Sequence, residues 1–112
     1  MRKITTALQA AVVTMLVAKR PALDRLPISW DLESDGTITV RLWHDADEEA
    51  VAPQVAAELS RAMRGARTDS YVLPKSDGTI TRVTAVSAQS SGVPVSFHGY
   101  QRGLQPEGGE AE

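Results

Sequence analysis

The chain contains no cysteine and few aromatic residues. Its 112 residues include two Trp, two Tyr and one Phe. Without Cys the chain can form neither disulfides nor Cys-based zinc sites, and it has no thiol chemistry. Proteins of the reducing cytoplasm typically lack disulfides, so we expect a cytoplasmic protein. The scarcity of aromatic residues also argues against the base-stacking surfaces that single-strand nucleic-acid binders use.

Neither sign of charge predominates, and no hydrophobic run is long enough to cross a membrane. Twelve Lys and Arg side chains against fourteen Asp and Glu give a net charge of -2, which argues against an extensive nucleic-acid surface. The most apolar segment, residues 4–18, is interrupted by three Thr residues and Gln9, whereas a membrane span needs about 20 mainly apolar residues. We therefore expect an amphipathic helix here and no membrane partner. Because Met1-Arg2-Lys3 precedes the segment, a secretory signal at 1–18 is the alternative.

The sequence also lacks the loops that hold nucleotides or calcium. Neither G-x-G-x-x-G nor G-x-x-x-x-G-K occurs, and the two Asp-Gly pairs lack the further acidic positions of a calcium loop. No serine lies in a nucleophile-elbow motif. We therefore expect no cofactor and no enzymatic activity.

What the sequence does contain is a repeated turn. Ser-Asp-Gly-Thr-Ile-Thr occurs at residues 34–39 and again at 76–81, each time between segments that alternate apolar and polar residues. Asp-Gly in this setting predicts a β-hairpin, because Gly takes positive φ freely and Asp tolerates it. The strands of the first hairpin are 28–33 and 38–42, and those of the second are 71–73 and 80–87. Within the last segment Ile80 and Val83 fall on opposite faces, which indicates a bulge or a strand covered on both sides.

Apolar residues at helical spacing predict two helices. The first spans residues 3–19, and its apolar stripe consists of Ile4, Leu8, Ala11, Val12, Met15 and Leu16. The second begins near Glu48 to Ala52, because Pro53 must lie within about the first turn. Its stripe consists of Val51, Val55, Leu59, Ala62 and Met63, and Gly65 is its expected stop.

A fifth strand contains Val93, Pro94, Val95 and Phe97. Because proline cannot donate a ladder hydrogen bond, we place this strand at a sheet edge. The order of elements predicts an α+β fold, in which a single antiparallel sheet of four or five strands has two helices on one face (αββαββ, with the fifth strand last). The single domain spans residues 1–101, and the Gly-, Pro- and Glu-rich tail 102–112 is expected to be disordered. A duplicated αββ unit is an alternative explanation of the repeated turn.

Four segments together resemble those of small uncharacterised proteins of actinobacterial phages and integrative elements. They are the Thr/Ala-rich first helix, Leu26-Pro27-Ile28, Asp35-Gly36-Thr37-Ile38-Thr39-Val40 and Gly92-Val93-Pro94-Val95. Nine Arg against three Lys agree with a high-G+C genome. The resemblance implies a mobile-element setting and supplies no activity or site residues.

Trp43 is the main candidate for an interaction residue. It follows the second strand on the face opposite the apolar side chains, where a sheet covered on one face leaves it exposed, and an exposed Trp often anchors a partner. The alternative buries Trp43 beneath a helix end or against the final strand. His98 and Tyr100 are out of phase with the apolar residues of the last strand, so together with Trp43 they form a patch on the outer sheet surface. We therefore predict a non-enzymatic protein-interaction or regulatory module, which forms a homodimer through the Pro94 edge or the Trp43 face.

A nucleic-acid accessory protein is the first alternative. Arg61, Arg64 and Arg67 are spaced by three and can contact phosphates from one helical face and its exit. Their favourable placement at the negative end of the helix dipole explains the same residues.

A metal-dependent hydrolase is the second alternative. His44, Asp45 and Asp47 are potential ligands of a divalent metal. Their spacing matches no metal motif, and helix-capping acids beside a loop histidine explain them equally. We therefore expect no metal site.

Overall fold

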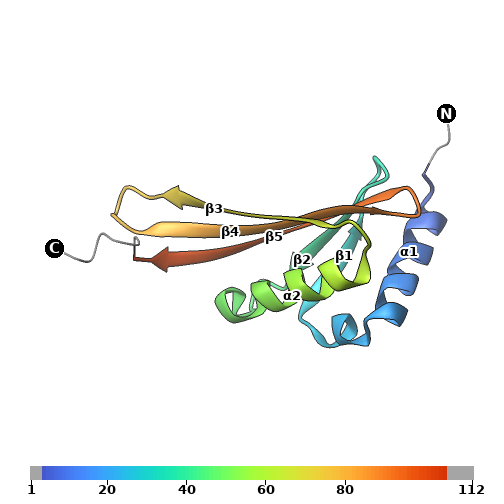
Figure 1. Ribbon diagram of the computed structural model, residues 1–112, viewed down its shortest axis with the longest axis horizontal. Coiled ribbons are helices and arrows are strands. Elements are labelled where there is room, and N and C mark those ends of the chain that lie inside the picture. Colours follow the sequence, from blue (N-terminus) through green and yellow to red (C-terminus); the bar gives the residue numbers. More distant parts are fainter. Residues whose placement is uncertain (1–3, 106–112) are drawn as a thin grey trace.

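The computed structural model describes residues 4–105 and shows an α+β fold, which confirms the predicted class (Figure 1). It contains two α-helices and one five-stranded sheet, and the helices and strands follow each other along the chain in the predicted order. The elements are α1 (Thr6–Lys19), the short 3-10 helix η1 (Pro21–Arg25), β1 (Ile28–Leu32), β2 (Ile38–Leu42), α2 (Glu48–Ala62), β3 (Arg67–Pro74), β4 (Ile80–Ser90) and β5 (Val93–Leu104). The two helices lie on the same side of the sheet, and within residues 4–105 no helix covers its other side (Figure 1).

The sheet is mixed, which corrects the prediction of a purely antiparallel one. The strand order is β1-β2-β5-β4-β3, and β5 pairs parallel with β2 and antiparallel with β4. The Pro94 strand is therefore central, and its predicted edge position is wrong. Pro94 is tolerated because the pairing with β2 begins only at Val95. Ser90 and Val93 flank a two-residue turn and exchange hydrogen bonds, so the next residue, Pro94, has its nitrogen directed away from β4.

Both copies of the repeated hexapeptide form hairpin turns, as predicted. In each turn an aspartate accepts a hydrogen bond from the N–H of the threonine two residues on: Thr37 to Asp35 at 3.0 Å and Thr79 to Asp77 at 2.9 Å. Hydrogen bonds from Thr37, first from its backbone N–H and then from its hydroxyl, lower the pKa of the Asp35 carboxyl. Hydrogen bonds from Thr79, first from its hydroxyl and then from its N–H, lower the pKa of the Asp77 carboxyl. These hydrogen bonds therefore favour the ionised form of both carboxyls, and the ionised carboxylates stabilise the tight turns.

Helix α1 turns the predicted face inward, with Val12 and Leu16 buried and Ile4 and Leu8 packed against the core. Thr5 caps it, because its hydroxyl accepts a hydrogen bond from the Leu8 N–H at 3.1 Å. The buried residues are Gln9, Val12 and Leu16, whereas Ala11 of the predicted stripe is exposed. Gln9 is thus a buried polar residue beside the apolar ones, and its amide donates to the Glu33 and Thr37 carbonyls at the first hairpin turn.

Helix α2 begins at Glu48, within the predicted range, and ends just before Met63. It packs across β5 and β4 (Figure 1). Its close approach depends on Gly99 of β5, where an added Cβ would lie 2.5 Å from the Cβ of Ala52. The core between the helices and the sheet includes Leu16, Ile38, Val55, Leu59, Val86 and Phe97.

Beyond α2, the strands β3, β4 and β5 extend as an arm, which we define as residues 71–83 together with 100–104 (Figure 1). The arm makes the molecule elongated, with extents of 55 × 31 × 25 Å. It contains a bulge: Ile80 pairs with Leu104 but Arg82 pairs with Gln101, so β5 has one extra residue here. The predicted irregularity near Ile80 is confirmed, with the additional residue in the partner strand. Strand β5 also continues three residues past the predicted domain end, and the predicted disorder of 106–112 lies outside the described residues.

Candidate interaction site

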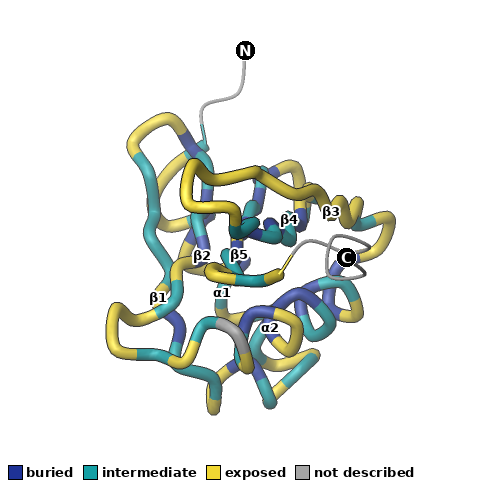
Figure 2. Tube along the Cα trace, turned by 90° about the vertical axis from the view of Figure 1, so that its left-hand side faces the viewer, coloured by how far each residue is buried: buried dark blue, intermediate teal, exposed yellow. Residues whose placement is uncertain are grey.

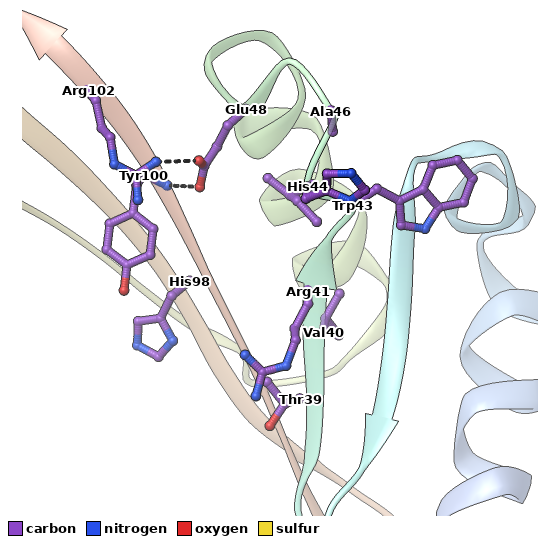
Figure 3. Close-up of a pocket in the computed structure, with 11 residues that line it drawn as sticks. Thr39, Val40, Arg41, Trp43, His44, Ala46, Glu48, His98, Tyr100 and Arg102 are labelled. Atoms are coloured by element: carbon purple, nitrogen blue, oxygen red, sulfur yellow. Dashed lines mark hydrogen bonds and ion pairs between the residues drawn. The ribbon is translucent and has the colours of Figure 1, made fainter.

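The sheet opens between β2 and β5. Their parallel pairing covers only residues 38–40 and 95–97, although β2 continues to Leu42 and β5 to Leu104. Beyond the paired segment the two strands diverge, and the start of α2 approaches the gap (Figure 3). A cavity of about 460 Å³ occupies this region, and we call it the β2–β5 hollow.

Three of the four predicted interaction residues line the β2–β5 hollow: Trp43, His98 and Tyr100. They come from the end of β2 and from β5, so the fold brings together residues that are 55 positions or more apart in the sequence. Pro94 lies elsewhere, beside the turn between β4 and β5. The structure therefore brings Trp43, His98 and Tyr100 to one hollow and places Pro94 outside it.

Trp43 is 54% exposed, which confirms its predicted exposure. Its backbone N–H donates to the Pro27 oxygen at 2.9 Å, and its indole is directed away from His98 and Tyr100, toward β1 (Figure 3). On that side the indole lines a second hollow of about 300 Å³, together with Leu26, Pro27 and Trp30. Trp43 thus stands between a polar hollow and a more apolar one.

Glu48 closes the gap left by the diverging strands. One carboxylate oxygen accepts a hydrogen bond from the Tyr100 backbone N–H at 2.6 Å, and the other pairs with the Arg102 guanidinium at 2.9 Å. In a continuous ladder the Tyr100 N–H would face a carbonyl of the neighbouring strand. The Glu48 carboxylate therefore accepts the hydrogen bond that a β2 carbonyl would accept in a continuous ladder. It also fixes the start of α2 against β5.

The cations of the β2–β5 hollow are held by carboxylates. Arg41 pairs with Asp31 and lies 3.6 Å from Glu33, and Arg102 lies over the Tyr100 ring at 5.1 Å while it pairs with Glu48. His44 and His98 are exposed at the hollow. The hollow therefore presents hydrogen-bonding and aromatic groups with their charges already compensated, an arrangement that suits polar protein contacts.

The residues of the two alternative functions lie differently. Arg61, Arg64 and Arg67 are all exposed, near the C-terminal end of α2 and the start of β3, and Arg61 lies 3.6 Å from Glu58. They are at the other end of α2 from the β2–β5 hollow, so they share no surface with Trp43. His44, Asp45 and Asp47 are exposed, and within residues 4–105 no three His, Asp or Glu side chains are grouped so that they could hold a metal ion.

Sequence reasoning did not identify Glu48, Arg41 or Arg102 as members of this site. The sequence predicts Glu48 at the start of a helix, within the acidic segment that follows His44, and its hydrogen-bond partner lies 52 residues further along the chain. Only the placement of α2 beside β5 reveals its second role. The acidic start of the helix was nevertheless a usable signal, because such a carboxylate is free to bind neighbouring donors.

Comparison with protein-family models, curated proteins and solved structures finds no significant match. Among the described residues, no helix is both long and apolar enough to cross a bilayer. The site must therefore be interpreted from its own residues.

Glu48→Ala should expose the Tyr100 amide. A hydrogen bond to a charged group contributes about 1.5–3 kcal/mol, so we expect exchange of the Tyr100 N–H with solvent to quicken by about tenfold to a hundredfold. Amide exchange followed by NMR measures this. Asp47→Ala is the matched control, because Asp47 is the neighbouring carboxylate and its side chain makes no capping hydrogen bond. Equal Tyr100 exchange rates in the two variants would contradict the role of Glu48.

Proposed function

We propose that this chain is a non-enzymatic protein-interaction module that binds a protein partner through Trp43 and the two hollows beside it. The main support is the position of Trp43, which is 54% exposed between the β2–β5 hollow and the more apolar hollow near η1. Binding energy at protein interfaces is concentrated in a few large residues, Trp foremost, that are surrounded by hydrogen-bonding groups. The resemblance to proteins of actinobacterial mobile elements makes a regulatory role in that setting part of the proposal.

The neighbourhood of Trp43 fits this anatomy. On one side Leu26, Pro27 and Trp30 offer apolar contact. On the other side His98, Tyr100 and Arg41 offer donors and acceptors. A partner segment that crosses Trp43 would meet an apolar anchor point and a polar rim in succession.

Trp43→Ala should abolish partner capture while the chain stays folded. Since the indole is more than half exposed, its removal should lower the free energy of unfolding by less than about 1 kcal/mol. Partner affinity should fall at least about tenfold, as for a typical interface anchor. The immobilised wild type and variant are incubated with lysate of the native host, captured proteins are identified by mass spectrometry, and affinity is then measured with the purified partner.

Trp30→Ala is the matched control, because Trp30 is partly buried and packs against the core cluster. We expect it to lose stability by a few kcal/mol, as large-to-small substitutions at packed positions do. If Trp43→Ala unfolds the chain as readily as Trp30→Ala does, or retains the captured partner at full affinity, Trp43 is not the anchor.

A further inference from the structure

Strand β3 is a fully exposed edge of the sheet. Each of its eight residues is exposed, and Figure 2 shows this as a continuous exposed stretch along the strand. Four large hydrophobic residues of the described chain are exposed, and three of them are consecutive in β3: Tyr71 at 47%, Val72 at 50% and Leu73 at 40%. An unprotected apolar edge of this kind is a template for pairing with another strand.

The other edge strand, β1, is less accessible. It has five residues, of which only Ser29 is exposed. Its Asp31 is engaged by Arg41 from the neighbouring strand. Edge pairing is therefore favoured at β3.

The backbone groups that β3 leaves free follow from the turn to β4. The Lys75 N–H donates to the Thr79 oxygen at 2.9 Å, so Lys75 and every second residue before it have their backbone groups directed at β4. Val72 and Ser70 are in the opposite phase and present N–H and C=O at the free edge. Pro74 shares this phase, so its missing N–H costs no bond to β4 and its carbonyl remains available.

The sequence of β3 is self-complementary about Val72. In an antiparallel pair of two copies centred on this residue, Val72 faces Val72 of the second copy, and Tyr71 faces its Leu73. Three positions from the centre, Asp69 faces Lys75 of the second copy, once on each side of the centre. Apolar residues therefore meet in the middle, and opposite charges meet at both ends.

We propose that two copies of this chain pair antiparallel through β3, centred on Val72, and join their sheets into one continuous sheet. The two Val72 residues exchange both backbone hydrogen bonds, and each Ser70 N–H donates to the Pro74 carbonyl of the other copy. The Asp69 and Lys75 pairs are non-hydrogen-bonded positions, at which cross-strand side chains approach most closely. This surface is separate from the Trp43 site, so the inference goes beyond the proposed function.

Val83 shows that the arm already holds an apolar row of side chains on the face of the sheet away from α2. Val83 is fully buried although it is not among the members of the main core cluster. It pairs with Tyr71 on one side and with Tyr100 on the other, so these rings flank it on the face away from α2. Pairing through β3 would extend this row with Leu73 of the second copy.

Charge reversal tests the register as well as the contact. Asp69→Lys and Lys75→Asp each replace the two attractive pairs of the dimer with two repulsive ones, and we expect each to weaken dimerisation at least about tenfold. The double variant Asp69→Lys/Lys75→Asp restores opposite charges at both ends and should return to within about threefold of the wild-type dissociation constant. Sedimentation equilibrium of the full chain over a range of concentrations measures all four proteins.

Asp24→Lys is the control for net charge, because Asp24 is exposed on η1, away from β3. It should dimerise as the wild type does, and circular dichroism should show that every variant is folded, since Asp69 and Lys75 are both exposed. A wild-type chain that stays monomeric at millimolar concentration overturns the proposal. So does a dimer that single charge reversals leave intact or that the double variant fails to restore.

Trp43→Ala separates the two proposals. If the chain dimerises through β3, this variant should dimerise normally and lose only its heterologous partner. A dimer that dissociates on Trp43→Ala and not on charge reversal would place self-association at the Trp43 site and overturn the β3 interface.

Discussion

Gly99→Ala should destabilise the folded chain by about 1–3 kcal/mol, the usual cost of overfilling a packed core. The new methyl group would lie 2.5 Å from the Ala52 Cβ and 3.0 Å from the Phe97 ring. Because the Ala52 Cβ is fixed to the backbone of α2, the helix must move away from β5. That movement would also disturb Glu48 at the start of the same helix. Urea unfolding measures the loss as a lower midpoint at unchanged slope.

Ala52→Gly provides the matched background for this substitution. Ala52→Gly removes the Ala52 Cβ, which is the atom nearest to the new methyl group. It lowers the free energy of unfolding by about 1 kcal/mol, because glycine is unfavourable inside a helix. In this background Gly99→Ala should lose most of its effect, and the double-mutant cycle gives the coupling between the two positions. Additive effects would show that Ala52 does not set the spacing of α2 and β5.

Gln9→Glu should cost about 3–4 kcal/mol at pH 7. Gln9 is 2% exposed, and its amide donates to the Glu33 oxygen at 3.0 Å and to the Thr37 oxygen at 2.9 Å. A carboxylate at this position would face two carbonyl oxygens in a buried site, so it would fold only when protonated. The expected loss in the free energy of unfolding equals the cost of protonating a glutamate of ordinary pKa at pH 7. That cost is about 1.4 kcal/mol for each pH unit above about 4.3.

The sign of the pH dependence distinguishes this cause from a simple packing defect. The folded state raises the pKa of the introduced carboxyl above its unfolded value, so the penalty is present above the folded pKa and disappears as the pH falls toward the unfolded value. Relative to the wild type, the variant should therefore regain about 2–3 kcal/mol between pH 7 and pH 5. Gln9→Met has a similar size and no charge, and its smaller loss should not change with pH. A pH-independent loss in Gln9→Glu would contradict the burial of this group.

The local elements of this fold were predictable from the sequence, and the central pairing was not. The Asp-Gly turns determine both of the predicted hairpins, and Pro53 locates the start of α2, because each of these signals acts over a few residues. The hairpin of β4 and β5 also has a local signal in the sequence, the pair Ser91-Gly92. Ser91 and Gly92, with φ of 52° and 80°, form a two-residue turn with positive φ, which places β5 directly beside β4.

The parallel contact of β5 with β2 has no local signal. It joins residues 38–40 to residues 95–97, and the apolar pattern of either segment fits several sheet orders. Pro94 was misleading for the same reason, since a proline indicates a missing donor without showing where the neighbouring strand begins. The position of Gln9 could not be predicted either, because its two acceptors are carbonyls of a turn that reaches α1 only in the folded chain.

For the site, exposure was more predictable than geometry. The alternation of the strands placed Trp43, His98 and Tyr100 on one face, and all three line the β2–β5 hollow. The ionic partners of that hollow depend on how far β2 and β5 diverge, which is a consequence of sheet twist and of where α2 starts. Neither quantity is encoded in a short pattern.

The central position of β5 has a consequence for how the chain folds. It is the last strand of the described chain and the middle strand of the sheet, so the β1–β2 and β3–β4 hairpins have no common neighbour until β5 lies between them. Contacts over such long sequence separations slow folding, because the loop-closure entropy must be lost before the contacts form. Helix α2 packs most extensively on β5, so its contact with the sheet is complete only after residues 95–97 have been synthesised.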